Sequence, residues 1–169
     1  MQKHYVSVIP FIMNKTNVMR ILETGQIPFK AYEYDPAQGI DAKAVARYLN
    51  KEEERIFKTL VVQASTREYF VFVIPANAEL DLKKAAHAAG VKNVEMIPLK
   101  KLLPTTGYVH GGCSPIGMKK TFTTFIDETA ILFDTFCVSG GKIGVTIELN
   151  AEKLAVFINA RFADLTQNH

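Results

Sequence analysis

The segment that decides the fold is FKTLVVQA-STRE-YFVFVI, residues 57–74. Two strongly apolar stretches, 57–64 and 69–74, flank a short polar one, and this pattern predicts two buried strands joined by a hairpin-sized turn. One residue stands out, because Lys58 places a lone ammonium at the start of the first strand. Taken alone, Lys58 is slightly better explained as a lysine whose stem covers core while its head group reaches water.

Helices and strands are predicted on both sides of this hairpin without a regular β-α-β alternation. Side-chain caps predict four helices, which begin after Thr16, Asp41, Asp81 and Asn150. A further turn of helix is expected after Pro98. Other strands are predicted at residues 29–34, 94–97, 122–126, 130–138, 143–149 and 161–165.

Seven or eight strands with several short connections favour a single α/β domain with a curved, mixed sheet and flanking helices. The chain of 169 residues suits one domain, and it contains no repeat or linker. We assign this domain to residues 16–169. Residues 1–15 form an N-terminal extension, interrupted by Pro10, that we expect either to pack as an edge strand or to stay mobile.

Composition limits the functional classes. Hydrophobic residues make up 48% of the chain and charged residues 22%, which excludes wholesale disorder. The net charge of +3 permits a polyanionic partner without requiring one, since 20 basic residues stand against 17 acidic ones. No apolar run is long enough to span a membrane. The two cysteines lie far apart and form no disulfide framework, which favours a reducing, cytoplasmic location.

Three separated segments are candidates for one pocket: residues 57–61, 111–117 and 139–144. The last two are glycine-rich turns, in which backbone N–H groups can approach a ligand closely. A cation beside two such turns suits an anionic or carbonyl-bearing substrate. Each turn alone is equally well or better explained as a bulge or a hairpin connection. Their occurrence together moderately favours a site.

Common catalytic patterns fail in this sequence. The segment around Ser114 lacks the second glycine of a nucleophile elbow, and Met118 stands where a P-loop needs lysine. The four histidines and two cysteines show no metal-ligand spacing, so we expect neither a metal nor a cofactor. Cys113 could be an exposed reactive thiol, although no base accompanies it. Cys137 is predicted to be a small buried apolar side chain.

A set of linked motifs, in this order along the chain, resembles the YbaK/EbsC family. The motifs are Phe57-Lys58-Thr59-Leu60-Val61, Thr106-Gly107-Tyr108-Val109, Gly111-Gly112, Ser114-Pro115, Lys119-Lys120, Ile126-Asp127-Glu128 and Val138-Ser139-Gly140-Gly141-Lys142. The likeness extends from about Thr16 to Leu165. Members of this family are free-standing relatives of the editing domain inserted in bacterial prolyl-tRNA synthetases. The chain is most similar to the branch that removes cysteine mischarged onto proline tRNA.

The resemblance implies a fold, a reaction and a set of site residues. The fold is a single α/β domain with a mixed, strongly curved sheet and a cleft between sheet and helices. The implied catalytic residues are Lys58, Gly112 and Ser114. The implied substrate-binding residues are Tyr34, Ile40, Thr59, Gly111, Pro115, Ser139, Gly140 and Gly141, with Ile40 in a stretch that matches the family only loosely. The implied substrate is an aminoacyl-tRNA, and prolyl-tRNA synthetase is a candidate partner.

Elementary chemistry is consistent with cleavage of an aminoacyl ester. Backbone N–H groups of the 111–114 turn could stabilise the oxyanion, and Lys58 could hold a phosphate or the ester oxygens. Lys119 and Lys120 are candidates to contact the tRNA backbone, as are the lysine pairs at 83–84 and 100–101; at least one pair is better explained as a solvated face.

No serine–histidine pair is evident, which leaves water, a ribose hydroxyl or the sulfur of the substrate cysteine as the nucleophile. Two other functions stay open: a catalytically silent module that binds tRNA or a synthetase, and a thiol-redox protein that uses Cys113.

Overall fold

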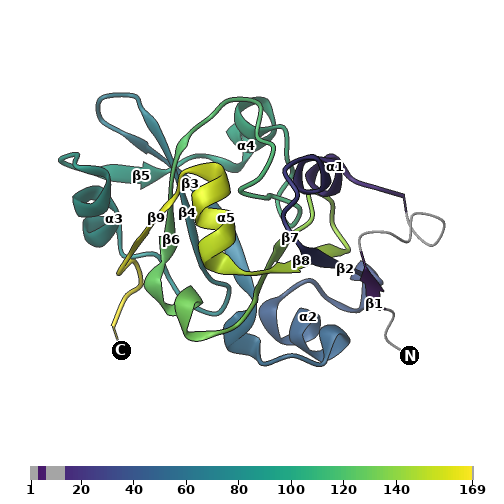
Figure 1. The fold of residues 1–169 in the computed structure, drawn as a ribbon. Helices are drawn as coiled ribbons and strands as arrows, with labels where there is room; N and C mark the ends of the chain where they lie inside the picture. Colours follow the sequence, from purple (N-terminus) through teal and green to yellow (C-terminus); the bar gives the residue numbers. More distant parts are fainter. Residues whose placement is uncertain (1–3, 7–13, 169) are drawn as a thin grey trace.

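The computed structural model describes residues 4–6 and 14–168, which form one domain of mixed α/β class, as predicted (Figure 1). Its α-helices are α1 (Asn17–Thr24), α2 (Ala42–Leu49), α3 (Leu82–Ala89), α4 (Leu99–Thr106) and α5 (Ala151–Ile158). Its strands are β1 (His4–Val6), β2 (Phe29–Glu33), β3 (Phe57–Ala64), β4 (Tyr69–Pro75), β5 (Val94–Met96), β6 (Thr123–Asp127), β7 (Phe136–Ser139), β8 (Val145–Leu149) and β9 (Arg161–Ala163). Short 3₁₀ helices span Pro36–Gln38, Glu53–Arg55 and Glu128–Leu132. None of the helices described has the length and hydropathy of a membrane span.

The strands form two sheets where the sequence predicted one curved sheet. The first has the order β1-β2-β8-β7 and is antiparallel throughout. The second has the order β5-β3-β4-β6-β9 and is mixed, because β6 runs parallel to both β4 and β9. A parallel bridge between Ile56 and Cys137 connects the two sheets just before β3 begins.

Most element boundaries follow the predicted caps. The side chains of Thr16, Asp41, Asp81 and Asn150 each accept a hydrogen bond from a backbone N–H in the first turn of the helix that follows. The predicted strand 130–138 is wrong in its first half. There the Asp127 carboxylate accepts the Thr129 N–H and opens a 3₁₀ helix, so that the strand begins only at Phe136. Helix α4 is also longer than the single turn expected after Pro98.

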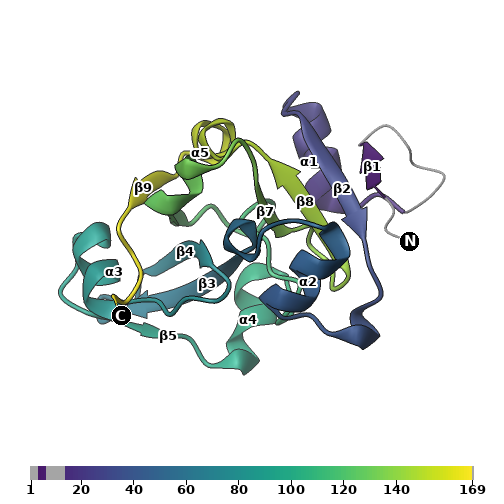
Figure 2. The same cartoon turned by 90° about the horizontal axis from the view of Figure 1, so that it is seen from below.

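Helices cover both faces of the first sheet. Figure 2 shows α1 on one side of β2 and β8 and α2 on the other. Side chains alternate accordingly, because Phe29 and Ala31 pack into the core with α1 while Tyr32 packs with α2. Strand β1 pairs with β2, so residues 4–6 of the predicted extension form an edge strand; residues 1–3 and 7–13 lie outside the described residues.

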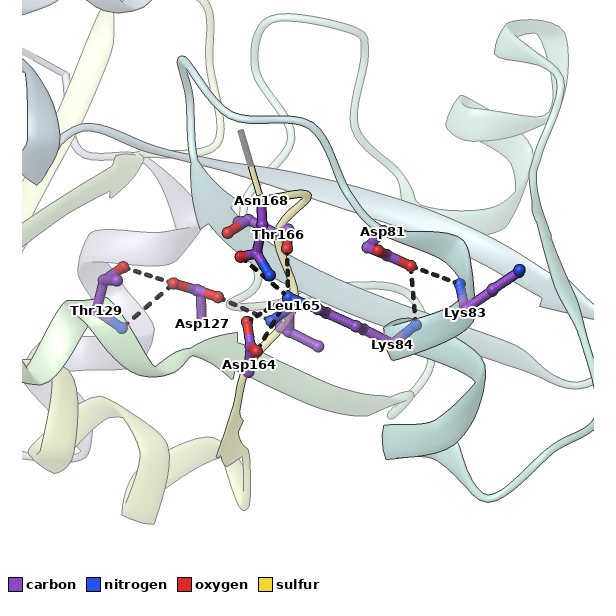
Figure 3. Close-up of polar contacts among 9 residues, drawn as sticks. All are labelled: Asp81, Lys83, Lys84, Asp127, Thr129, Asp164, Leu165, Thr166 and Asn168. Carbon is purple, nitrogen blue, oxygen red and sulfur yellow. Dashed lines mark hydrogen bonds and ion pairs between the residues drawn. The ribbon is translucent and has the colours of Figure 1, made fainter.

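The C-terminal segment is held at the end of the molecule that carries α3 (Figure 1). The buried Asp127 carboxylate accepts the Leu165 N–H at 3.0 Å (Figure 3). Lys84 Nζ, on α3, donates to Asp164 at 3.0 Å and to the Thr166 carbonyl at 2.7 Å. These bonds give Asp127 and Lys84 structural roles.

Candidate active site

A cavity of about 360 Å³ lies where the two sheets meet. Its walls come from the start of β3, from β7 and β8, from the N-terminal half of α2, and from the turn that follows α4. The cavity therefore receives residues from five separated parts of the chain, at positions 34–45, 56–60, 76, 102–113 and 137–146. Of the predicted site residues, Tyr34, Ile40, Lys58, Thr59, Gly111 and Ser139 line it.

The β3 wall supplies the two polar groups Lys58 and Thr59. Lys58 is half-buried, and among the described residues its ammonium forms no ion pair. Asp41 lines the same cavity, but its carboxylate caps α2 by accepting the Ala44 N–H at 2.8 Å. The ammonium is therefore available to an anionic oxygen that enters the cavity.

Thr59 is 9% exposed, and its hydroxyl has no hydrogen-bond partner among the residues described. A buried hydroxyl without a partner costs free energy, because water would otherwise solvate it. Its position on the cavity wall makes it a natural partner for a polar group of a ligand.

The turn at residues 111–117 packs against the turn at 139–144, as the sequence predicted. A Cβ added to Gly112 would lie 3.0 Å from the Ile143 nitrogen, so a side chain there would separate the two turns. Gly111 lines the cavity and has φ +87°, a conformation that favours glycine.

Gly112, Ser114 and Pro115 lie behind the cavity surface and are not among its lining residues. The Gly112 N–H donates to the Val109 carbonyl at 3.0 Å. The fully buried Ser114 hydroxyl accepts the Ile116 N–H at 3.2 Å. These bonds stabilise the turn, and a direct catalytic role for Gly112 or Ser114 stays a prediction.

The 139–144 turn is a hairpin connection whose first residue lines the cavity. The Ser139 hydroxyl accepts the Gly141 N–H at 3.2 Å. A Cβ on Gly140 would lie 2.5 Å from Val145 Cγ1, and one on Gly141 would lie 2.9 Å from Val18 Cγ2. Both glycines therefore allow close packing and do not line the cavity, while Ser139 does.

Tyr34 and Ile40 complete the predicted pocket. The Tyr34 ring stacks on Tyr48, with centroids 5.1 Å apart. Burial raises the pKa of Tyr34. Hydrogen bonds with the Gly144 backbone and the Thr146 side chain lower this pKa in part, but burial is the larger effect. Ile40 is 42% exposed and approaches Gly111.

The two cysteines line the cavity as buried thiols. Burial raises the pKa of Cys113 to about 11, although a hydrogen bond with Thr106 lowers it in part. Cys113 is therefore not the exposed reactive thiol that the sequence left open, because this side chain is only 8% exposed. Cys137 is fully buried, as predicted, and burial raises its pKa to about 12. At neutral pH both are neutral thiols and poor nucleophiles.

Among the lining residues that sequence reasoning did not assign to the site, four carry polar or ionisable side chains: Asp41, His110, Cys137 and Thr146. Asp41 was assigned only as a helix cap, and Cys137 only as core. Thr146 and Glu148 are polar side chains in an otherwise apolar strand, β8, and they lie on one face of it. This alternation was the signal in the sequence that could have assigned that face to the site.

Lys119 and Lys120 are exposed and lie outside the cavity. Lys119 Nζ donates to the Pro104 carbonyl on α4 at 3.4 Å. Within residues 4–6 and 14–168, no three histidine, cysteine, aspartate or glutamate side chains gather as a metal site requires.

The family described as the aminoacyl-tRNA editing domain matches residues 37–157, which is well over half of the chain. This chain belongs to the aminoacyl-tRNA editing family. The matched region contains every residue that lines the cavity except Tyr34.

Individual relatives agree with this assignment. EbsC of Enterococcus faecalis, named provisionally as a Cys-tRNA(Pro)/Cys-tRNA(Cys) deacylase, is 48% identical over 153 residues, covering 90% of this chain and 93% of that protein. This confirms the YbaK/EbsC resemblance.

Two solved structures support the fold. One, described as a provisional trans-editing enzyme for prolyl-tRNA synthetase, has a TM-score of 0.78 at 22% identity and covers 90% of this chain and 99% of that chain. Another, described as a hypothetical protein, has a TM-score of 0.83 at 20% identity and covers 90% of this chain and 100% of that chain. At these identities the two structures show the fold alone.

Proposed function

We propose that this protein is an aminoacyl-tRNA deacylase that removes cysteine from mischarged tRNA(Pro), and also from tRNA(Cys), in the cytoplasm. Membership of the editing family supports the reaction class. The name of the 48% identical EbsC protein supports cysteine as the amino acid.

The observation that carries the proposal is the Lys58 ammonium on the cavity wall without a described ion-pair partner. An aminoacyl ester gains negative charge on its carbonyl oxygen when it is attacked, and it is attached to a terminal adenosine bearing a phosphate. A fixed ammonium stabilises either charge through a charge-assisted hydrogen bond. A cavity of about 360 Å³ is in the size range of small-molecule sites, so it suits the aminoacyl end of the tRNA.

The residues of the cavity favour a nucleophile supplied by the substrate. The buried thiols of the two cysteines have raised pKa values. In the described part of the chain, neither the Ser114 nor the Ser139 hydroxyl is hydrogen bonded to a histidine. In the proposed reaction the thiolate of the substrate cysteine attacks its own ester carbonyl. The carbon–oxygen bond to ribose breaks, the ribose oxygen takes up the thiol proton, and cysteine leaves as a cyclic thioester. The protein orients these atoms and stabilises the oxyanion.

Oxyanion donors are assigned to the 111–114 turn. The Gly112 N–H is bonded to Val109, so we assign this role to the N–H groups of Gly111 and Cys113, which both line the cavity. Loss of one such donor costs about 3–4 kcal/mol in model enzymes.

We assign contact with the tRNA backbone to the lysines on and beside α4. Lys100, Lys101, Lys119 and Lys120 are exposed, and Leu102, next to Lys101 on α4, lines the cavity. Lys84 is a weaker candidate, because its ammonium is bonded to Asp164 and Thr166. An association with prolyl-tRNA synthetase stays a prediction.

The test is loss of the ester from cysteinyl-tRNA(Pro) incubated with the purified protein. Lys58→Ala should abolish cleavage while unfolding stays cooperative, because Lys58 forms no described ion pair that packing depends on. Lys58→Arg should also be poor, since a planar guanidinium cannot replace a compact ammonium in a small cavity. A protein that binds tRNA without cleaving the ester would instead be the silent binding module, and the deacylase proposal would be wrong.

A further inference from the structure

A buried carboxylate lies beside the cavity, on the same face of β8 as the cavity-lining Thr146. Glu148 is 5% exposed and accepts hydrogen bonds from the hydroxyls of Tyr32 and Thr135. Its third partner is Lys51, whose Nζ lies 3.3 Å away. Among the residues described, none of these four lines the cavity, so the proposed chemistry does not use them.

The partners of Glu148 connect it to three walls of the cavity. Lys51 follows α2, whose N-terminal half forms one wall. The Thr135 hydroxyl also accepts a hydrogen bond from Arg55 Nη1 at 3.4 Å, and Arg55 lies three residues before Lys58. On the third side, Cys137 pairs in register with Glu148, lines the cavity and bridges to Ile56.

The charge of Glu148 makes this arrangement costly to break. Burial by itself raises the pKa of Glu148, but bonds from Thr135, Tyr32 and Lys51 outweigh burial, so that its pKa is lowered and it stays an anion. A buried charge that loses a partner is strongly unfavourable, so each of these contacts contributes to holding Glu148 in place.

We propose that Glu148 is a positioning residue: through Thr135 and Arg55 it fixes the start of β3, and through Lys51 it fixes α2, so that the Lys58 ammonium is held at its place across the cavity. This inference rests on the proposed function for its kinetic test only.

The kinetic test uses Glu148→Gln and Thr135→Val with cysteinyl-tRNA(Pro). Both variants should lower kcat by about 10- to 100-fold, the effect of displacing a reacting group by about 1 Å, with KM little changed. Thr135→Ser keeps the hydroxyl and should restore wild-type kcat. Thr124→Val is the matched control, because the buried Thr124 hydroxyl also donates a hydrogen bond, to the Phe122 carbonyl at 2.9 Å, and Thr124 does not line the cavity. It should lower stability and leave kcat unchanged.

A second measurement follows Lys58 without turnover. In protein labelled with ¹³C-lysine, the ε-carbon signal that disappears in Lys58→Arg belongs to Lys58. This signal should shift in Glu148→Gln and Thr135→Val, but not in Thr135→Ser or Thr124→Val. If Glu148→Gln does not fold, Thr135→Val decides, because it leaves the Lys51–Glu148 ion pair in place.

The two readouts separate the two proposals. An inactive wild-type protein would overturn the deacylase assignment, while the Lys58 signal would still test the role of Glu148. An unchanged Lys58 signal in Thr135→Val, measured where that variant is fully folded, would overturn the positioning role. So would an unchanged kcat in an active enzyme.

Discussion

Thr59→Val should stabilise the free protein while weakening its function. Thr59 is 9% exposed, and its hydroxyl has no partner among the described residues. Burying a hydroxyl without a partner costs about 1–3 kcal/mol, and valine has nearly the same shape without that group. We therefore expect the free energy of unfolding to rise by about 1 kcal/mol, the lower end of that range.

The matched control is Thr124→Val on strand β6 of the same sheet. Thr124 is 5% exposed, but its hydroxyl donates to the Phe122 carbonyl at 2.9 Å. Removing this bond should lower the free energy of unfolding by about 1 kcal/mol. Urea unfolding followed by circular dichroism measures both changes, and 1 kcal/mol corresponds to roughly 2–4 °C in Tm for a chain of this size.

The activity of Thr59→Val should change in the opposite direction from its stability. A hydroxyl that bonds a substrate only when substrate is present contributes about 1.5 kcal/mol, so we expect kcat/KM for cysteinyl-tRNA(Pro) to fall about tenfold. A loss of stability as large as in Thr124→Val would refute the reasoning, because it would mean that the Thr59 hydroxyl has a partner in the free protein. Unchanged kcat/KM would remove Thr59 from the site.

Three further predictions follow from the site. Cys113→Ala should retain most activity, and alkylating reagents should modify Cys113 slowly at neutral pH, because its pKa is raised to about 11; loss of activity in Cys113→Ala would restore the covalent or redox hypothesis. Lys119→Ala combined with Lys120→Ala should weaken binding to different tRNAs alike and flatten the dependence of affinity on salt, measured by filter binding at several salt concentrations; a complex that salt does not weaken would contradict the assignment. Seryl- and alanyl-tRNA(Pro) should lose their esters far more slowly than cysteinyl-tRNA(Pro), because serine carries a poorer nucleophile and alanine carries none; equal rates for all three would exclude attack by the substrate thiol.

The local features of this fold could be predicted from the sequence. Caps such as Asp41 and Asn150 act within three residues, and both helices begin where these side chains predict. The strand predicted at 130–138 failed because its apolar residues gave no sign that Asp127 would open a 3₁₀ helix. The two sheets are connected by one bridge, Ile56 to Cys137, between segments far apart in the sequence, and no local pattern predicts it.

The site could be predicted only in outline. Glycine turns and a lone lysine indicated which segments meet, and those segments do meet around the cavity. The absence of a partner for the Thr59 hydroxyl is a property of the packed structure. So is the convergence on Glu148 of the hydroxyls of Tyr32, in β2, and of Thr135, just before β7. Neither leaves a local pattern, because the groups involved are far apart in sequence.

The pairing of β2 with β8 has a consequence for synthesis on the ribosome. Tyr32 and Glu148 are 116 residues apart, and translation at about 5–20 residues per second needs roughly 6–23 s to make the intervening chain. Throughout that time one edge of β2 has no neighbour, and an open strand edge is a template for association with other chains. Editing activity therefore begins only when nearly the whole chain has been made. If a ribosome stalls before residue 145, the unfinished chain exposes the open edge of β2, which is prone to aggregation, and it has no editing activity.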